Sequence, residues 1–175
     1  MDSAFDTAIA FVLSVEGGYV DNPLDPGGAT NMGITLRTLA LWRGTAVTKA
    51  AVKALTVGEA TAIYGAHYWN AAHCAYLPLG LDLLVFDGAV NLGPGRSSKM
   101  LQAVAGAEQD GSIGPLTLAA LAPKDHLMCI ESIVSLRNDF YRSLSTFHTF
   151  GKGWLARTAA ARVKALQLAG GSIAT

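Results

Sequence analysis

The chain has 175 residues, of which 51% are hydrophobic, and a formal net charge of zero. This length fits one domain, or a small domain with an appended helical lobe, and the apolar fraction excludes general disorder. A net charge of zero argues against a dedicated nucleic-acid-binding protein. The two cysteines, Cys74 and Cys129, are far apart in apolar surroundings. We therefore expect two buried free thiols and synthesis in a reducing compartment.

The N-terminal segment predicts an apolar helix that ends at Gly17-Gly18, because its hydrophobic residues recur at helical spacing from Phe5 to Val15. Its apolar run is preceded by acidic residues and by no basic residue, which is not the pattern of a signal peptide. No other stretch approaches the length of a membrane span. We therefore expect synthesis in the cytoplasm without a signal peptide, no stable membrane insertion and a monomer.

A loop with many turn residues follows over residues 19–35, with a short hairpin around Met32–Ile34. The remaining chain predicts helices separated by Gly, Pro and capping residues. N-caps are expected at Thr35, Thr56 and Asp125 and at Ser97 or Ser98. Pro115 is expected as the first residue of a helix. The expected helices are 35–43, 49–55, 56–69, 81–91, one after Ser97 or Ser98, 116–121, 125–144 and 154–168. The fold class is therefore mainly α.

Glu16 is the first candidate for chemistry. It stands where the apolar helix ends, and the negative end of the helix dipole disfavours a charge there. Such a position suits a general acid, although glutamates near helix ends are common on protein surfaces. Cleavage of a sugar bond needs an acid of this kind together with a second carboxylate.

The loop after Glu16 contains residues that can complete such a site. Asp21 and Asp25 are near enough for a turn to bring one of them opposite Glu16, and Thr30 can position a water molecule. Asp and Asn residues beside proline are also common turn formers, so at least one of Asp21, Asn22 and Asp25 is expected to have only that role. Which aspartate supplies the second carboxylate stays open at this point.

Other polar and aromatic residues complete the set of candidates. Tyr19, Tyr68 and Trp69 offer ring faces on which a sugar can stack, whereas Trp42 and Tyr64 are expected in the core. Asp87 lies among apolar residues, so we expect it to be buried and hydrogen-bonded, with Asn91 one turn later. The histidines lack the spacing of a metal site, and no phosphate-binding loop is present, so no metal or cofactor is expected.

Several spaced motifs resemble glycoside hydrolase family 108. They are Glu16-Gly17-Gly18-Tyr19, Asp25-Pro26-Gly27-Gly28, Thr30-Asn31, Gly33-Ile34-Thr35, Tyr68-Trp69, Leu77-Pro78 and 86–91. The family consists of N-acetylmuramidases that cleave peptidoglycan, found among phage endolysins and secretion-associated bacterial proteins. The resemblance implies a lysozyme-like fold with Glu16 as the catalytic acid. A looser similarity to phage-type lysozymes places Asp25 and Thr30 beside Glu16.

A second resemblance covers the C-terminal half. Leu101-Gln102, Gly106, Asp110-Gly111, Ile113-Gly114-Pro115, Thr117 and Ala120-Leu121 are similar to predicted peptidoglycan-binding modules. The resemblance implies a catalytic region over residues 1–91 and a helical lobe over residues 92–175, packed as one compact unit. Asp110-Gly111 is also expected to form a tight turn, and Gly114-Pro115 to begin a helix. The motif can therefore also be interpreted as a structural brace that binds nothing.

We expect a muramidase that hydrolyses the β-1,4 bond between N-acetylmuramic acid and N-acetylglucosamine. Glu16, Asp25 and Thr30 are the expected catalytic residues. Tyr19, Asp21, Tyr68, Trp69 and Asn91 are the expected substrate-binding residues. The partner is bacterial peptidoglycan, reached in the periplasm or cell wall through a holin or a specialised export route. Two alternatives stay open: a lytic transglycosylase, and a non-catalytic protein that binds the wall or helps secretion.

Overall fold

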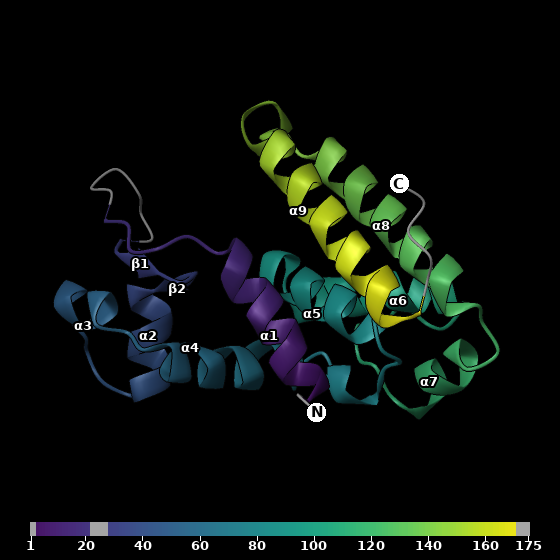
Figure 1. The fold of residues 1–175 in the computed structure, drawn as a ribbon, viewed down its shortest axis with the longest axis horizontal. Coiled ribbons are helices and arrows are strands. Elements are labelled where there is room, and N and C mark those ends of the chain that lie inside the picture. The colour runs from purple at the N-terminus through teal and green to yellow at the C-terminus, as the bar shows by residue number, and fades with distance from the viewer. Residues whose placement is uncertain (1–2, 22–27, 171–175) are drawn as a thin grey trace. The chain divides into compact units, whose positions relative to one another are not determined.

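A computed structural model describes residues 3–21 and 28–170. The described chain is mainly α-helical and contains one short antiparallel hairpin, as the sequence predicts (Figure 1). The chain folds into two compact units. The smaller unit is Ile9–Ala66, and the larger unit combines Met1–Ala8 with His67–Thr175. Helix α1 (Ala4–Val15) begins in the larger unit and ends in the smaller one.

The smaller unit is built around the hairpin. Strands β1 (Thr30–Asn31) and β2 (Ile34–Thr35) pair in antiparallel register, Thr30 opposite Thr35. Three helices follow: α2 (Leu36–Arg43), α3 (Lys49–Lys53) and α4 (Val57–Tyr64). The side chains of Thr35 and Thr56 cap α2 and α4, which confirms both predicted starts.

The larger unit is a helical assembly. After the start of α1, the chain enters this unit again in the π-helix η1 (Gly65–Trp69), whose first two residues belong to the smaller unit. It continues through the 3-10 helix η2 (Cys74–Tyr76). Helices α5 (Leu81–Leu92), α6 (Pro94–Ala105), α7 (Pro115–Leu121), α8 (His126–Ser143) and α9 (Phe147–Leu168) follow. Pro115 opens α7 and Asp125 caps α8, as predicted.

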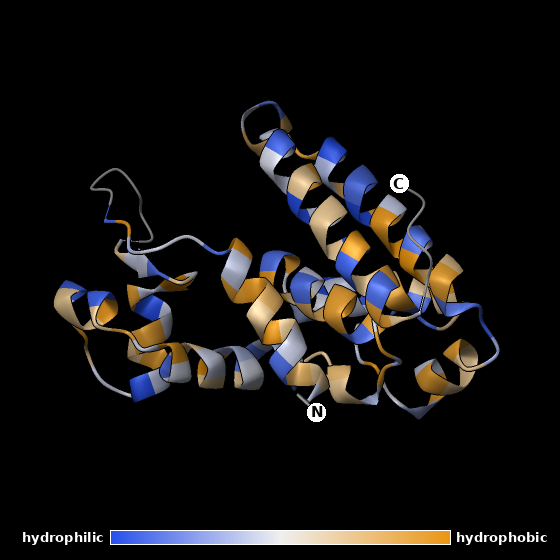
Figure 2. Cartoon of the chain, in the orientation of Figure 1, coloured by the Kyte–Doolittle hydropathy of each residue, from blue (hydrophilic) through white to orange (hydrophobic). Residues whose placement is uncertain are grey.

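Helices α8 and α9 lie side by side and both contact α5 (Figure 1). Figure 2 shows hydrophobic and hydrophilic residues alternating along α8 and α9, which is typical of helices with one buried face. Helix α5 is buried from Leu81 to Ala89. The buried Asp87 carboxylate lies 2.6 Å from Arg137 of α8 and 2.8 Å from Arg157 of α9. Asp87 is therefore buried and paired, as predicted, and links three helices of the larger unit.

The structure corrects two predicted helix starts. Ser97 and Ser98 do not cap α6, because both are buried inside the helix and the Ser97 hydroxyl donates to the carbonyl of Val85. Helix α9 begins at Phe147, not near Trp154. The two glycines in its first turns made the segment resemble a loop. Gly151 lets the Phe147 ring pack against this turn, since a Cβ atom there would lie 2.5 Å from the ring and the ring would have to move.

Two further details differ from the sequence prediction. The helix expected over residues 56–69 is α-helical only to Tyr64 and continues as a π-helix. Trp42 is 38% exposed, so its predicted core position is wrong, whereas Tyr64 is 1% exposed as predicted. Cys74 and Cys129 are buried free thiols, also as predicted. In the described part of the chain, no helix combines the length and apolar character needed to cross a bilayer.

Candidate active site

The backbone around Glu16 is fixed by the end of α1 and by the hairpin. The Glu16 N–H donates to the Val12 carbonyl at 3.1 Å, so the last helical hydrogen bond reaches this residue. Gly17 then leaves the helix, and its carbonyl accepts from the N–H of Met32 at 3.1 Å. The residue after Glu16 is thus bonded directly to the turn of the hairpin. This bond sets the direction in which the half-buried Glu16 side chain leaves the chain.

The turn itself is unusual in its residues. Met32 and Gly33 both have positive φ angles, 47° and 73°. A two-residue hairpin loop of this kind is a type I′ turn, in which asparagine or glycine is usual and methionine is strained. The Tyr64 hydroxyl donates to the Met32 carbonyl at 2.9 Å, and the buried Asn31 amide donates to the carbonyls of Val52 and Lys53. These bonds hold the strained turn in place.

Gly33 lies directly against the Glu16 carboxylate. A Cβ atom on Gly33 would lie 2.6 Å from Glu16 Oε2, 3.0 Å from its Cδ and 2.2 Å from the Tyr64 hydroxyl oxygen. No side chain larger than hydrogen fits without movement of these groups. The Glu16 carboxylate and the Tyr64 hydroxyl are therefore gathered at one point of the turn, which only glycine leaves open.

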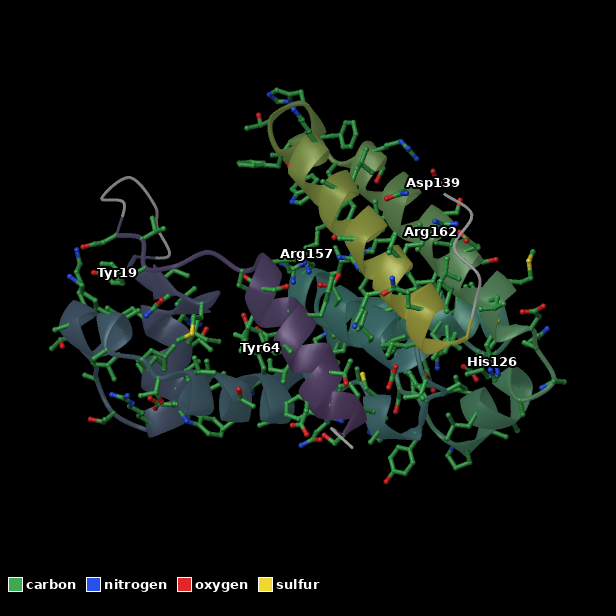
Figure 3. All side chains as sticks on the ribbon, viewed as in Figure 1. Tyr19, Tyr64, His126, Asp139, Arg157 and Arg162 are labelled. Atoms are coloured by element: carbon green, nitrogen blue, oxygen red, sulfur yellow. The ribbon has the colours of Figure 1, made fainter. Side chains whose placement is uncertain are left out.

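Lysines of α3 engage two other predicted site residues. Lys49 Nζ lies 3.0 Å from Asp21 Oδ1, and Lys53 Nζ lies 5.8 Å from the centre of the Tyr19 ring, a cation–π distance. Figure 3 shows Tyr19 near α3. The backbone of Thr30, at the start of β1, exchanges two hydrogen bonds of 2.8 Å with Val20. The smaller unit therefore holds Glu16, Tyr19, Asp21 and Thr30, whereas Asp25 lies outside the described residues.

The remaining predicted site residues belong to the larger unit. Trp69 is 5% exposed and packs against Phe5 and Phe86, with ring centres 5.2 and 5.4 Å away. It also lines a cavity of about 290 Å³ beside His73 and Tyr76. Tyr68 is half-buried. Asn91 is exposed, and its amide donates to the Asp87 carbonyl at 2.8 Å.

The Asp110 motif is a hydrogen-bonded brace in the larger unit. The amide nitrogen of Gln102 donates to the Asp110 carboxylate at 2.7 Å and to the Thr117 hydroxyl at 3.1 Å. The amide oxygen of Gln102 accepts from the N–H of Gly111 at 2.9 Å. The Gln102 bond, helped by the N–H of Ser112, lowers the pKa of Asp110 below its ordinary value. The motif therefore joins α6 to the start of α7, as its interpretation as a structural brace predicts.

Sequence comparison agrees with the motifs around Glu16. The family model described as Glycosyl hydrolase 108 matches residues 9–93. A solved structure, that of Brucella abortus SagA, is 49% identical over 96% of this chain and 97% of the other, with a TM-score of 0.87. The chain belongs to glycosyl hydrolase family 108. This family 108 protein is therefore a glycoside hydrolase. No curated protein matches it significantly.

Sequence reasoning missed three residues that shape this family 108 site. Tyr64 was expected only as a core aromatic, and Asn31 and Gly33 only as parts of a motif. The signal for the turn was present, because Met32-Gly33 separates two short β-prone segments. No sequence pattern predicts that Gly33 lies against Glu16, because this contact depends on tertiary packing. Among the described residues, no group of three His, Cys, Asp or Glu side chains is placed to hold a metal ion.

Proposed function

We propose that this family 108 enzyme hydrolyses bacterial peptidoglycan at the β-1,4 bond from N-acetylmuramic acid to N-acetylglucosamine. Membership of a glycoside hydrolase family supports cleavage of a glycosidic bond. The observation that carries the proposal is the Glu16 carboxylate, held against the Gly33 turn beside the Tyr64 hydroxyl. The enzyme reaches the wall after release through a holin or a specialised export route.

In the proposed reaction Glu16 is the general acid. It transfers its proton to the glycosidic oxygen while the bond between that oxygen and the muramyl C1 atom breaks. A second carboxylate stabilises the oxocarbenium-like transition state or accepts a proton from the attacking water. The oxygen of that water becomes the new hydroxyl on C1. A hydrogen-bonded helix end and a tight turn fix the position of the acid, which favours a short transfer.

We assign the second carboxylate to Asp25. Asp21 already pairs with Lys49 at 3.0 Å, and Tyr19 lies beside Lys53, so this part of the loop is attached to α3. An aspartate committed to a lysine is a poor partner for a developing cation, which makes Asp21 the weaker choice. Thr30, which forms an antiparallel β-bridge with Val20, is then proposed to position the water. Tyr68, Trp69 and Asn91 are proposed substrate contacts.

The test is clearance of purified peptidoglycan by wild type and by Glu16→Gln. We expect the variant to lose at least about 100-fold in rate, the usual contribution of a general acid. Glu59→Gln is the matched control, because Glu59 is also a glutamate of the smaller unit but pairs with Arg43 at 2.6 Å. It should keep its activity. Equal clearance by wild type and Glu16→Gln would refute the assignment of the acid.

Two further measurements refine the mechanism. Asp25→Asn should lose far more activity than Asp21→Asn if Asp25 is the second carboxylate, and the reverse order would assign that role to Asp21. Mass spectrometry of the products distinguishes attack by water from attack by the muramyl 6-hydroxyl. Reducing muramyl ends are expected. Anhydromuramyl ends would show a lytic transglycosylase instead.

A further inference from the structure

Two cavities of the larger unit adjoin at Arg96. The first, of about 620 Å³, lies along α6 and the Asp110 loop and has the size of a typical ligand pocket. The second, of about 250 Å³, lies where α5 meets α6 and reaches α8 and α9. Arg96 lines both, and we name the two neighbouring cavities together the Arg96 groove. The proposed reaction uses no residue of this groove except Asn91.

The larger cavity carries two cations and one acid. Neither Arg96 nor Lys99 has an ion-pair partner within 4.0 Å among the described residues. The Asp110 carboxylate accepts hydrogen bonds from Gln102 and Ser112, and the charge of the neighbouring Lys99 also helps to lower its pKa. Gly111, with φ of 86°, lets the loop pack against the Lys99 stem, because a Cβ atom there would lie 3.3 Å from Lys99 Cε. The groove therefore carries two positively charged side chains, and the packing of the Gly111 loop fixes the position of one of them, Lys99.

The smaller cavity is lined by aromatic rings. Tyr141 and Trp154 stack with centres 5.1 Å apart and planes 23° apart. The Arg96 guanidinium lies 4.2 Å from the centre of the Phe140 ring. This cation–π contact holds the guanidinium over the ring, and a guanidinium held in place can bind a carboxylate through two parallel hydrogen bonds.

We propose that the Arg96 groove binds the acidic stem peptide of peptidoglycan. The inference rests on the proposed function, which makes peptidoglycan the substrate. Stem peptides carry several carboxylates for Arg96 and Lys99, and small alanyl side chains that match the apolar lining at Met100, Ala103 and Leu136. A bare glycan of N-acetylglucosamine has no charge for these cations. A nucleic acid would need more cations than two in a chain of zero net charge.

The test measures binding by calorimetry to Glu16→Gln protein, which leaves the groove intact. The probes are a free tripeptide of L-Ala, γ-D-Glu and diaminopimelate, and chitotetraose as a peptide-free glycan. We expect the tripeptide to bind and Arg96→Gln or Lys99→Gln to weaken it about tenfold, the effect of losing one charge-assisted bond. Lys152→Gln removes the same charge from an exposed site outside both cavities and should leave the affinity unchanged.

Arg96→Lys separates charge from geometry, because it keeps the charge but loses the paired hydrogen bonds, and it should bind more weakly than wild type. The inference is overturned if the tripeptide does not bind, if Lys152→Gln weakens it as much as Lys99→Gln, or if chitotetraose binds with the same dependence on Arg96. These failures leave the proposed function untouched when Glu16→Gln has lost hydrolysis. If Glu16→Gln still hydrolyses the wall, the acid assignment fails whatever the groove binds.

Discussion

Gly33→Ala is expected to damage both stability and catalysis, because the added methyl group would enter the space beside Glu16. Its Cβ atom would lie 2.2 Å from the Tyr64 hydroxyl oxygen and 2.6 Å from Glu16 Oε2. Alanine at a φ of 73° costs about 1–2 kcal/mol by itself. Overpacking of the site adds about 1–3 kcal/mol. The free energy of unfolding should therefore fall by about 3 kcal/mol.

The effect on activity follows from displacement of the acid. Gly33, Tyr64 and Glu16 cannot keep their positions once the methyl group is present, and a shift of about 1 Å in a reacting group can cost about 100-fold in rate. The assays are chemical denaturation for stability and clearance of purified peptidoglycan for activity. Activity has to be compared under conditions in which the variant is still folded.

Gly44→Ala is the matched control. Gly44 also has a positive φ, 66°, but a Cβ atom there would meet nothing within 4 Å. This variant should show only the backbone cost of about 1–2 kcal/mol and should keep its activity. Adding Tyr64→Phe to Gly33→Ala removes the closest clash, so part of the stability should return while activity stays low. The reasoning is refuted if Gly33→Ala matches Gly44→Ala in both assays.

Two further predictions concern the larger unit. Asp87→Asn removes the charge that two guanidiniums share in the core, so the free energy of unfolding should fall by about 3–5 kcal/mol in denaturation experiments. Burial raises the pKa of Asp82 above its ordinary value, 3.8. The folded protein then holds this proton more tightly than the unfolded chain, so this carboxyl lowers stability as pH rises above about 4. Asp82→Asn should reduce that pH dependence in melting curves from pH 3 to pH 7.

Both predictions have informative controls. Asp139→Asn breaks an exposed pair with Arg142 and should cost less than about 1 kcal/mol. An equally small cost for Asp87→Asn would contradict a structural role of its ion pairs. For Asp82, an asparagine keeps an oxygen to accept from the N–H groups of Gly80 and Leu83. An unchanged pH profile in that variant would show that the Asp82 carboxyl does not carry the effect.

Most of the fold could be predicted from local sequence. Thr35, Thr56, Asp125 and Pro115 mark helix starts correctly, because capping depends on residues within one turn of each other. The prediction failed where packing overrides local preference. Ser97 is buried against α5, and the glycine-containing start of α9 is helical.

The sequence alone determined the mainly helical fold and the hairpin after the first helix, and it led to the hypothesis that Glu16 is the acid. These features depend on neighbouring residues and on ordered motifs that the chain itself displays. Only the tertiary structure decided which residues surround Glu16. It brought Gly33 and Tyr64 to the Glu16 carboxylate and paired Asp21 with Lys49. Such contacts join residues far apart in the chain, and their distances are fixed by packing, which no local pattern encodes.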